Sequence, residues 1–181
     1  QLKTTAEVSE SSAEIKTEGA MSLRRNRKKL PLEGLRVIDF TFVVQGPYAG
    51  MFLADMGAEV VRVETLNLLP IGGRGQWARP SREAEMNATT SSYPNRDPGE
   101  RPWNRVANYN VWARNKHSMT ADLSTDEGKE SFRRLIEQTD IFIENVATGS
   151  MERRGLNYPV VSEWNPRLIM ISSTGPGQTG P

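Results

Sequence analysis

The sequence predicts an α/β fold with a mostly parallel sheet, and three observations lead to this prediction. A short β-branched run, Arg36–Phe40, predicts a buried strand, and Glu59–Glu64 predicts a second one. Residues 48–56 between them carry apolar side chains at helical spacing, and Gly57 follows as a helix-ending residue. Two strands that are joined through a helix by short links must run parallel, with a right-handed crossover.

The second half of the chain continues this alternation of strands and helices. Three further strands are predicted at residues 118–123, 140–144 and 168–173. Ser124 and Glu127 have the spacing of a capping box, which predicts a helix from there to about residue 138. Two short helical turns are predicted at residues 151–154 and 160–164. The fold class is therefore α/β, a mostly parallel sheet of about five strands with flanking helices.

Two segments depart from this regular pattern. Residues 1–30 are polar, end in a basic run and predict a disordered tail, so the domain is expected to cover residues 31–181. Residues 66–113 are rich in Gly, Pro, Asn and Ser, with no sustained period. An irregular segment of this length inside a domain is expected to have a function or to lie against a partner.

Composition excludes several classes of function. Lys and Arg total 23 against 22 Asp and Glu, so the net charge of +1 predicts no field for nucleic acid. No apolar run reaches the ~18–20 residues that span a bilayer. We therefore expect a soluble, cytoplasmic protein that binds neither nucleic acid nor a membrane. The chain has no cysteine and a single histidine, His117, which excludes thiolate chemistry and multi-histidine metal sites.

Three loops are expected at one edge of the sheet. Ligands of parallel sheets bind at the carboxyl ends of the strands, where loops meet helix N-termini. Thr41–Pro47, Asn145–Ser150 and Ser173–Gly180 each follow a predicted strand. These loops are therefore the candidate ligand-binding edge.

The residue pattern leaves the ligand open. The first loop lies where a dinucleotide fingerprint would be, and Glu64 ends the second strand as a ribose-binding acid does. However, G-x-G-x-x-G is missing, and Pro47 removes a backbone N–H that a pyrophosphate would use. A tight turn without a ligand fits equally. Asn145 and Arg153 fit either as anchors for a phosphorylated ligand or as local backbone and solvent contacts.

Three ordered blocks of the sequence resemble the class III coenzyme A-transferases (the CaiB/BaiF family). The first block, residues 31–64, reads PLEGLRVIDFTFVVQGPYAGMFLADMGAEVVRVE. The second, residues 114–156, reads RNKHSMTADLSTDEGKESFRRLIEQTDIFIENVATGSMERRGL. The third, residues 165–181, reads NPRLIMISSTGPGQTGP. The family shows the same order: a Gly-Pro turn and L-A-D-x-G-A-x-V, then N-K-x-S and D-x-x-x-E-N, then N-P-R-L-I and G-Q-x-G-P.

The resemblance implies a CoA-transferase that moves coenzyme A from an acyl-CoA donor to a carboxylic acid. In the family an Asp carboxylate attacks the thioester to form a mixed anhydride and release the CoA thiolate. That Asp follows the G-Q-x-G-P block, so we expect it beyond Pro181 and expect these 181 residues alone to be inactive, with no catalytic residue among them. The family has a Rossmann-like large domain and a smaller one, so the resemblance implies that residues 31–181 are the N-terminal part of the large domain. Its interlocked dimers imply a homodimer, or a heteromer with the remainder of the fold.

The resemblance also implies which residues contact CoA, which is a substrate and not a permanently bound cofactor. The matching positions are Phe42, Val43, Val44, Gln45, Asn145, Val146 and Arg153. Val146 stands where the family often has Phe, and Ser124 where some members have Lys. Three alternatives remain: an acyl-CoA racemase or isomerase of the same family, a non-catalytic CoA-binding subunit, and an NAD(P)-binding oxidoreductase.

Overall fold

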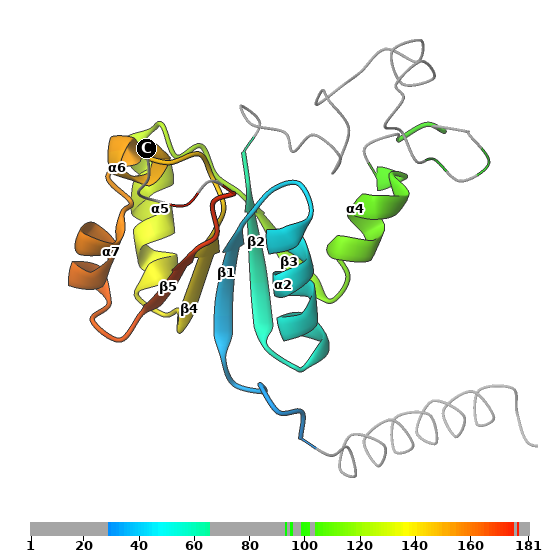
Figure 1. The fold of residues 1–181 in the computed structure, drawn as a ribbon, viewed down its shortest axis with the longest axis horizontal. Coiled ribbons are helices and arrows are strands. Elements are labelled where there is room, and N and C mark those ends of the chain that lie inside the picture. Colours follow the sequence, from blue (N-terminus) through cyan, green and yellow to red (C-terminus); the bar gives the residue numbers. More distant parts are fainter. Residues whose placement is uncertain are drawn as a thin grey trace, which may run out of the picture. The chain divides into compact units, whose positions relative to one another are not determined.

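The fold is seen in Figure 1, a computed structural model that describes residues 29–65, 93, 95, 99–101, 104–175 and 177. The chain divides into two units, Gln1–Leu30 and Pro31–Pro181, and the second unit contains every helix and strand of the described ranges. The predicted tail up to residue 28, and most of the segment predicted to be irregular, lie outside the described residues.

Five strands form one sheet in which every neighbouring pair is parallel, as the sequence predicts. The order across the sheet is β3-β2-β1-β4-β5. The strands are β1 (Arg36–Phe40), β2 (Glu59–Glu64), β3 (Lys116–Thr120), β4 (Ile141–Glu144) and β5 (Ile169–Ser172). The order reverses direction at β1, which lies at the centre between β2 and β4. Loops on either side of such a reversal point leave an opening at the carboxyl edge of the sheet.

Helices cover both faces of this sheet (Figure 1). On one side lie α5 (Asp126–Ile136), α6 (Ser150–Arg154) and α7 (Tyr158–Trp164). On the other side lie α2 (Gln45–Asp55) and α4 (Ala107–Trp112). Right-handed crossovers produce this division, because the chain moves outward in one direction from β1 to β3 and in the other from β4 to β5.

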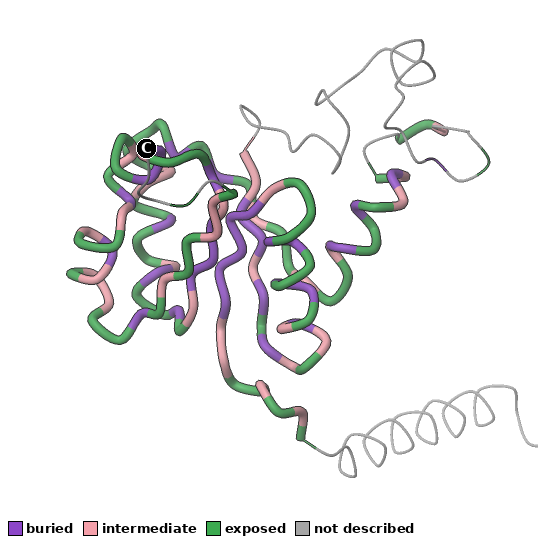
Figure 2. The backbone as a smooth tube through the Cα atoms, viewed as in Figure 1, coloured by how far each residue is buried: buried purple, intermediate pink, exposed green. Residues whose placement is uncertain are grey.

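The larger hydrophobic core lies between the sheet and the α5 side. Phe132 of α5 meets Phe142 of β4 edge to face, with ring centroids 5.4 Å apart, and both side chains are fully buried. Leu156 and Val161 extend the same cluster under α6 and α7. Each such side chain contributes roughly 1.5–3 kcal/mol through burial. Figure 2 shows the burial concentrated on the central strands.

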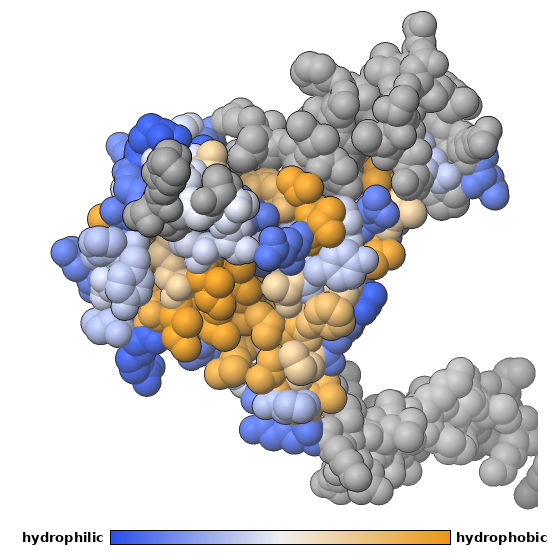
Figure 3. Space-filling model, viewed as in Figure 1, coloured by the Kyte–Doolittle hydropathy of each residue, from blue (hydrophilic) through white to orange (hydrophobic). Residues whose placement is uncertain are grey.

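The opposite face of the sheet is only partly covered. Ala54 of α2 packs on Val37, Val60 and Ile143, which close the core over β1 and β2. On β5, however, Ile169 and Ile171 are paired with Ile141 and Ile143 and face the same side. They are 58% and 43% exposed, and Figure 3 shows apolar surface gathered on the face in view.

Two sequence predictions of element position were wrong. The third strand is β3 at Lys116–Thr120 and not residues 118–123, because its ladder with β2 begins at the pair Val60 and Lys116 and ends at the pair Glu64 and Thr120. The segment predicted to be irregular contains α4, which packs against α2 and buries Tyr109 and Trp112. This short helix is stabilised by the tertiary contacts of these aromatic side chains, and such contacts cannot be predicted from the local sequence pattern.

The capping box prediction at Ser124 was also wrong. Thr125 is the N-cap of α5, and its side chain accepts a hydrogen bond from Gly128 N at 3.1 Å. Ser124 belongs to the turn before the helix, where its hydroxyl and its backbone N–H both donate to the Asp122 carboxylate. Two adjacent hydroxyl residues compete for the cap, and the Asp122 turn removes Ser124 from that role. Across the described residues, no helix has the length and apolar character required to cross a membrane.

Candidate functional site

The loop after β1 leaves the sheet from a buried carboxylate. Asp39 is fully buried, and its Oδ1 accepts hydrogen bonds from the backbone N–H and the hydroxyl of Thr41. Asp39 thus binds the first residue of the loop that follows its strand. Val43 and Val44 follow with 58% and 46% exposure, and Gln45 begins α2. Two β-branched apolar side chains therefore project from the carboxyl edge of the sheet.

Asn145, the residue after β4, binds the backbone of the loop after β1 through its side chain. Its Oδ1 accepts from Phe42 N at 2.7 Å, and its Nδ2 donates to Phe42 O at 2.7 Å. The carboxamide thus pairs with both polar backbone groups of one residue, 103 positions away in the sequence. The loops after β1 and β4 are neighbours, as the parallel sheet predicts, and Asn145 is the residue that joins them.

Lys116 fastens the start of α2 from the other side. Its ammonium group donates to Asp39 Oδ2 at 2.7 Å and to Pro47 O at 2.9 Å, and its side chain is only 1% exposed. Burial lowers the pKa of Lys116 below its ordinary value, although the Asp39 carboxylate acts in the opposite direction. A Cβ at position 50 would lie 2.8 Å from Asp39 Oδ2, so the close approach of α2 requires Gly50.

A second buried cation extends this cluster toward α4. Arg62 of β2 is 4% exposed and lies 3.9 Å from Asp39 and 3.3 Å from Glu64. Its guanidinium carbon lies 5.8 Å from the ring centroid of Tyr109, within the range of a cation–π contact. Sequence reasoning missed Arg62 and Lys116. The polar positions of the otherwise apolar EVVRVE strand were the available signal.

A basic cavity opens between the loop after β3 and α6. It has a volume of about 410 Å³ and is lined by Leu123, Ser124, Lys129, Arg153 and Arg154. The guanidinium groups are held in place: Arg153 donates to Ser150 Oγ and Arg154 to Ser150 O, both at 3.0 Å. Three cationic side chains around one concave surface can bind an anion such as a phosphate group.

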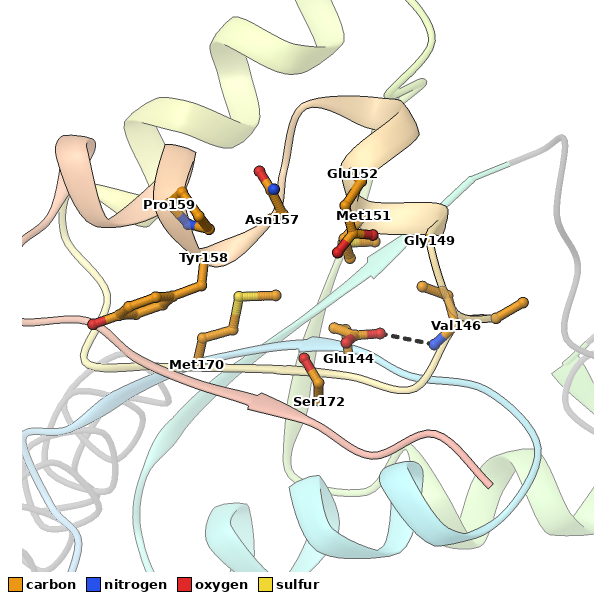
Figure 4. A pocket seen from close by; sticks show the side chains of 11 residues that line it. Glu144, Val146, Gly149, Met151, Glu152, Asn157, Tyr158, Pro159, Met170 and Ser172 are labelled. Carbon is orange, nitrogen blue, oxygen red and sulfur yellow. Dashed lines mark hydrogen bonds between the residues drawn. The ribbon is translucent and has the colours of Figure 1, made fainter. Parts of the chain in front are cut away.

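A second cavity, of about 290 Å³, lies on the other side of α6 (Figure 4). Its wall includes Met151, Met170 and Tyr158, together with the fully buried Glu144. One Glu144 oxygen accepts from Val146 N at 2.9 Å. The cavity therefore combines an apolar wall with a carboxylate, which makes it unlike the basic cavity.

The residues predicted to bind a ligand fall into two groups in the structure. Phe42, Val43, Val44, Gln45 and Asn145 come together at one loop pair, whereas Arg153 lines the basic cavity. Val146 lies between them, 9% exposed, with its side chain in the large core. His117 is an exposed residue of β3. Among the residues that the structure describes, no group of three or more His, Asp and Glu could hold a metal ion.

Comparison with known proteins gives consistent matches over nearly the whole second unit. Residues 32–181 match the model of CoA-transferase family III. The succinate–glutarate CoA-transferase of Agrobacterium fabrum is 39% identical over 156 residues, which cover 85% of this chain and 34% of that protein. The alpha subunit of succinyl-CoA–L-malate CoA-transferase of Chloroflexus aurantiacus is 38% identical, over 86% of this chain and 31% of that subunit.

Solved structures of similar fold point to the same family. A CaiB/BaiF family protein from Brucella suis superposes with a TM-score of 0.65 at 33% identity, over 85% of this chain and 36% of that one. A hypothetical protein from Mycobacterium tuberculosis gives 0.61 at 34% identity, over 86% and 36%. The 181 residues thus span about a third of the length of the proteins that they match. The chain belongs to CoA-transferase family III.

Proposed function

We propose that this chain supplies the coenzyme A-binding edge of an enzyme that transfers CoA from an acyl-CoA donor to a carboxylic acid. The reaction proceeds through an aspartyl mixed anhydride: a carboxylate oxygen attacks the thioester carbonyl, the C–S bond breaks, and the CoA thiolate leaves. The thiolate then attacks the aspartyl carbonyl of the anhydride, which releases the donor acid and leaves an aspartyl-CoA thioester. The acceptor carboxylate displaces CoA from this thioester to form a second anhydride, and the thiolate attacks the acceptor carbonyl, which gives the new acyl-CoA and frees the Asp carboxylate. We place the attacking Asp beyond position 181, in the two thirds of the relatives' length that this chain does not span.

The observation that carries the proposal is the basic cavity, considered together with family membership. Coenzyme A carries its negative charge on phosphate groups, which require cationic donors in fixed positions. Lys129, Arg153 and Arg154 supply such donors, and the Ser124 hydroxyl lines the same cavity. Arg154 adds a second guanidinium next to the arginine that the family resemblance assigns to a phosphate.

The names of the relatives suggest which acids to test. Relatives from Agrobacterium fabrum and Chloroflexus aurantiacus are named for succinate, glutarate and L-malate, all short dicarboxylates. We therefore propose a dicarboxylic acid as acceptor and succinyl-CoA as the first donor. The alpha and beta subunits of the malate enzyme also support an oligomer, either a homodimer or a heteromer.

The experiment is a thioester exchange assay on the intact protein from its native source. Isotope-labelled succinate is incubated with unlabelled succinyl-CoA, and label in the thioester pool is measured. In a parallel reaction the protein is treated with hydroxylamine and analysed by mass spectrometry for a hydroxamate on an Asp side chain, which attack on free succinyl-CoA cannot produce. Transfer and trapping together support the proposal. Exchange of the α-proton of an acyl-CoA without transfer would indicate a racemase instead, and CoA binding without either reaction would indicate a non-catalytic subunit. The absence of both binding and exchange would overturn the proposal.

A further inference from the structure

Val43 has an unusual backbone conformation. Its φ is +67°, in the left-handed region, whereas the other non-glycine residues with positive φ in the described part of the chain are Asn95 and Asn115. Asparagine tolerates this region, but a β-branched residue is a clear outlier there. The neighbouring Val44 has a negative φ of −130° with ψ −63°, so it lies outside the left-handed region. Such a conformation persists only where surrounding contacts impose it.

Side-chain hydrogen bonds hold the backbone at both ends of this loop. Immediately before Val43, the Asn145 carboxamide fixes both backbone polar groups of Phe42. On the far side, Lys116 fixes the Pro47 carbonyl. The backbone is therefore tied down at Phe42 and at the first turn of α2, and the exposed Val43–Gln45 segment spans the gap between the two anchors.

The Asn145 side chain makes both of its hydrogen bonds in the structure to the backbone of this loop. Its acceptor and its donor are each engaged by Phe42 at 2.7 Å, with the short lengths of well-formed hydrogen bonds. The amide keeps a second N–H and its oxygen a second lone pair, so these two bonds are compatible with a direct ligand contact as well as with an effect through the loop backbone. The two explanations differ in whether the effect of Asn145 depends on the conformation of the loop.

We propose that Asn145 is a positioning residue: it holds Val43 in the left-handed conformation and so sets the direction of the Val43–Val44 peptide toward the acyl-CoA. The identity of the ligand rests on the proposed function, whereas the clamp rests on the geometry alone. The proposal differs from a direct contact between Asn145 and CoA, because it makes the effect of Asn145 depend on the residue at position 43.

A double-mutant cycle separates the two explanations. Asn145→Ala removes both clamping hydrogen bonds, and we expect the Kd for CoA, measured by calorimetry on the intact protein at a temperature where all variants are folded, to rise about tenfold. Val43→Gly in the same background should recover most of this loss, because glycine adopts positive φ without a steric penalty. Val44→Gly is the matched control: it also replaces a valine by glycine, but at a negative φ, and should recover nothing.

Each outcome decides the proposal. Recovery by Val43→Gly and not by Val44→Gly supports it, whereas additive effects of the two substitutions, or equal recovery by both glycines, overturn it. If Asn145→Ala does not fold, Asn145→Asp serves in its place, since it keeps the acceptor and removes the donor. If the wild-type protein binds no acyl-CoA, the proposed function fails. The clamp is then judged by melting temperature, where Val43→Gly must reduce the loss caused at position 145 and Val44→Gly must not.

Discussion

Replacing Lys116 by Met tests the buried ion pair beneath the first loop. The substitution keeps the length of the side chain and removes its charge. Asp39 then loses a 2.7 Å contact while remaining fully buried, and the Pro47 carbonyl loses its donor at 2.9 Å. The backbone N–H and hydroxyl of Thr41 still donate to the other Asp39 oxygen. The carboxylate is thus left with fewer partners in an environment that excludes water.

The expected loss in the free energy of unfolding is about 3 kcal/mol. Removing one partner of a buried ion pair costs roughly 3–5 kcal/mol, because the other charge stays buried without compensation. We place Lys116→Met at the lower end, since Arg62 lies 3.9 Å from the same Asp39 oxygen and offsets part of the loss. Adding Asp39→Asn to this variant should restore stability, because a neutral amide in place of the carboxylate is less costly to bury.

Urea unfolding of the intact protein, followed by tryptophan fluorescence, measures these differences. Arg133→Met is the surface control: it breaks an exposed pair with Glu137, which is worth about 0.3–0.5 kcal/mol. Exposed ion pairs are worth up to about 1 kcal/mol. A free energy of unfolding for Lys116→Met within about 1 kcal/mol of the wild-type value would therefore refute the reasoning. So would a double variant with Asp39→Asn that is no more stable than Lys116→Met alone.

Two further predictions follow from local contacts. The hydrogen bond from Arg114 holds the pKa of Asp55 below its ordinary value. This carboxylate therefore stabilises the fold at a pH above the ordinary Asp pKa, and the contribution is lost as the pH falls through the lowered folded-state pKa. The melting temperatures of wild type and Asp55→Asn should therefore differ at neutral pH and converge in acid, and a constant difference would contradict the assignment. Gly128→Ala should destabilise the protein by about 1–3 kcal/mol in the same urea assay, because the new Cβ would lie 1.9 Å from Asp122 O; an unchanged midpoint would show that the turn before α5 can move freely.

The sequence predicted the elements whose local pattern agrees with their place in the fold. The bounds of β1 and β2 were correct, since both are apolar runs flanked by turn residues. The start of β3 was missed because its first three residues, Lys116, His117 and Ser118, are polar and show no alternation of apolar and polar side chains. For α4, the stabilising contacts of Tyr109 and Trp112 come from tertiary packing, which a propensity cannot report.

The same distinction applies to the candidate site. The proximity of the loops after β1 and β4 followed from strand order in a parallel sheet, which a sequence can indicate. The pairing of Asn145 with Phe42 could not be predicted, because it depends on a contact across 103 positions. The burial of Lys116 was missed for a related reason: a lysine usually indicates solvent, and only the geometry of Asp39, Gly50 and Pro47 makes its burial favourable.

The most direct test of the central claim is a calorimetric titration of the intact protein with CoA and succinyl-CoA, performed on wild type, Arg153→Met and Arg134→Met. Arg153 lines the basic cavity, whereas Arg134 is a 73% exposed side chain on the surface of α5 and controls for the loss of one positive charge. We predict binding by wild type, affinity weakened about tenfold by Arg153→Met, and no change with Arg134→Met. No measurable heat of binding for the wild-type protein with either ligand, or equal weakening by the two substitutions, would contradict the account.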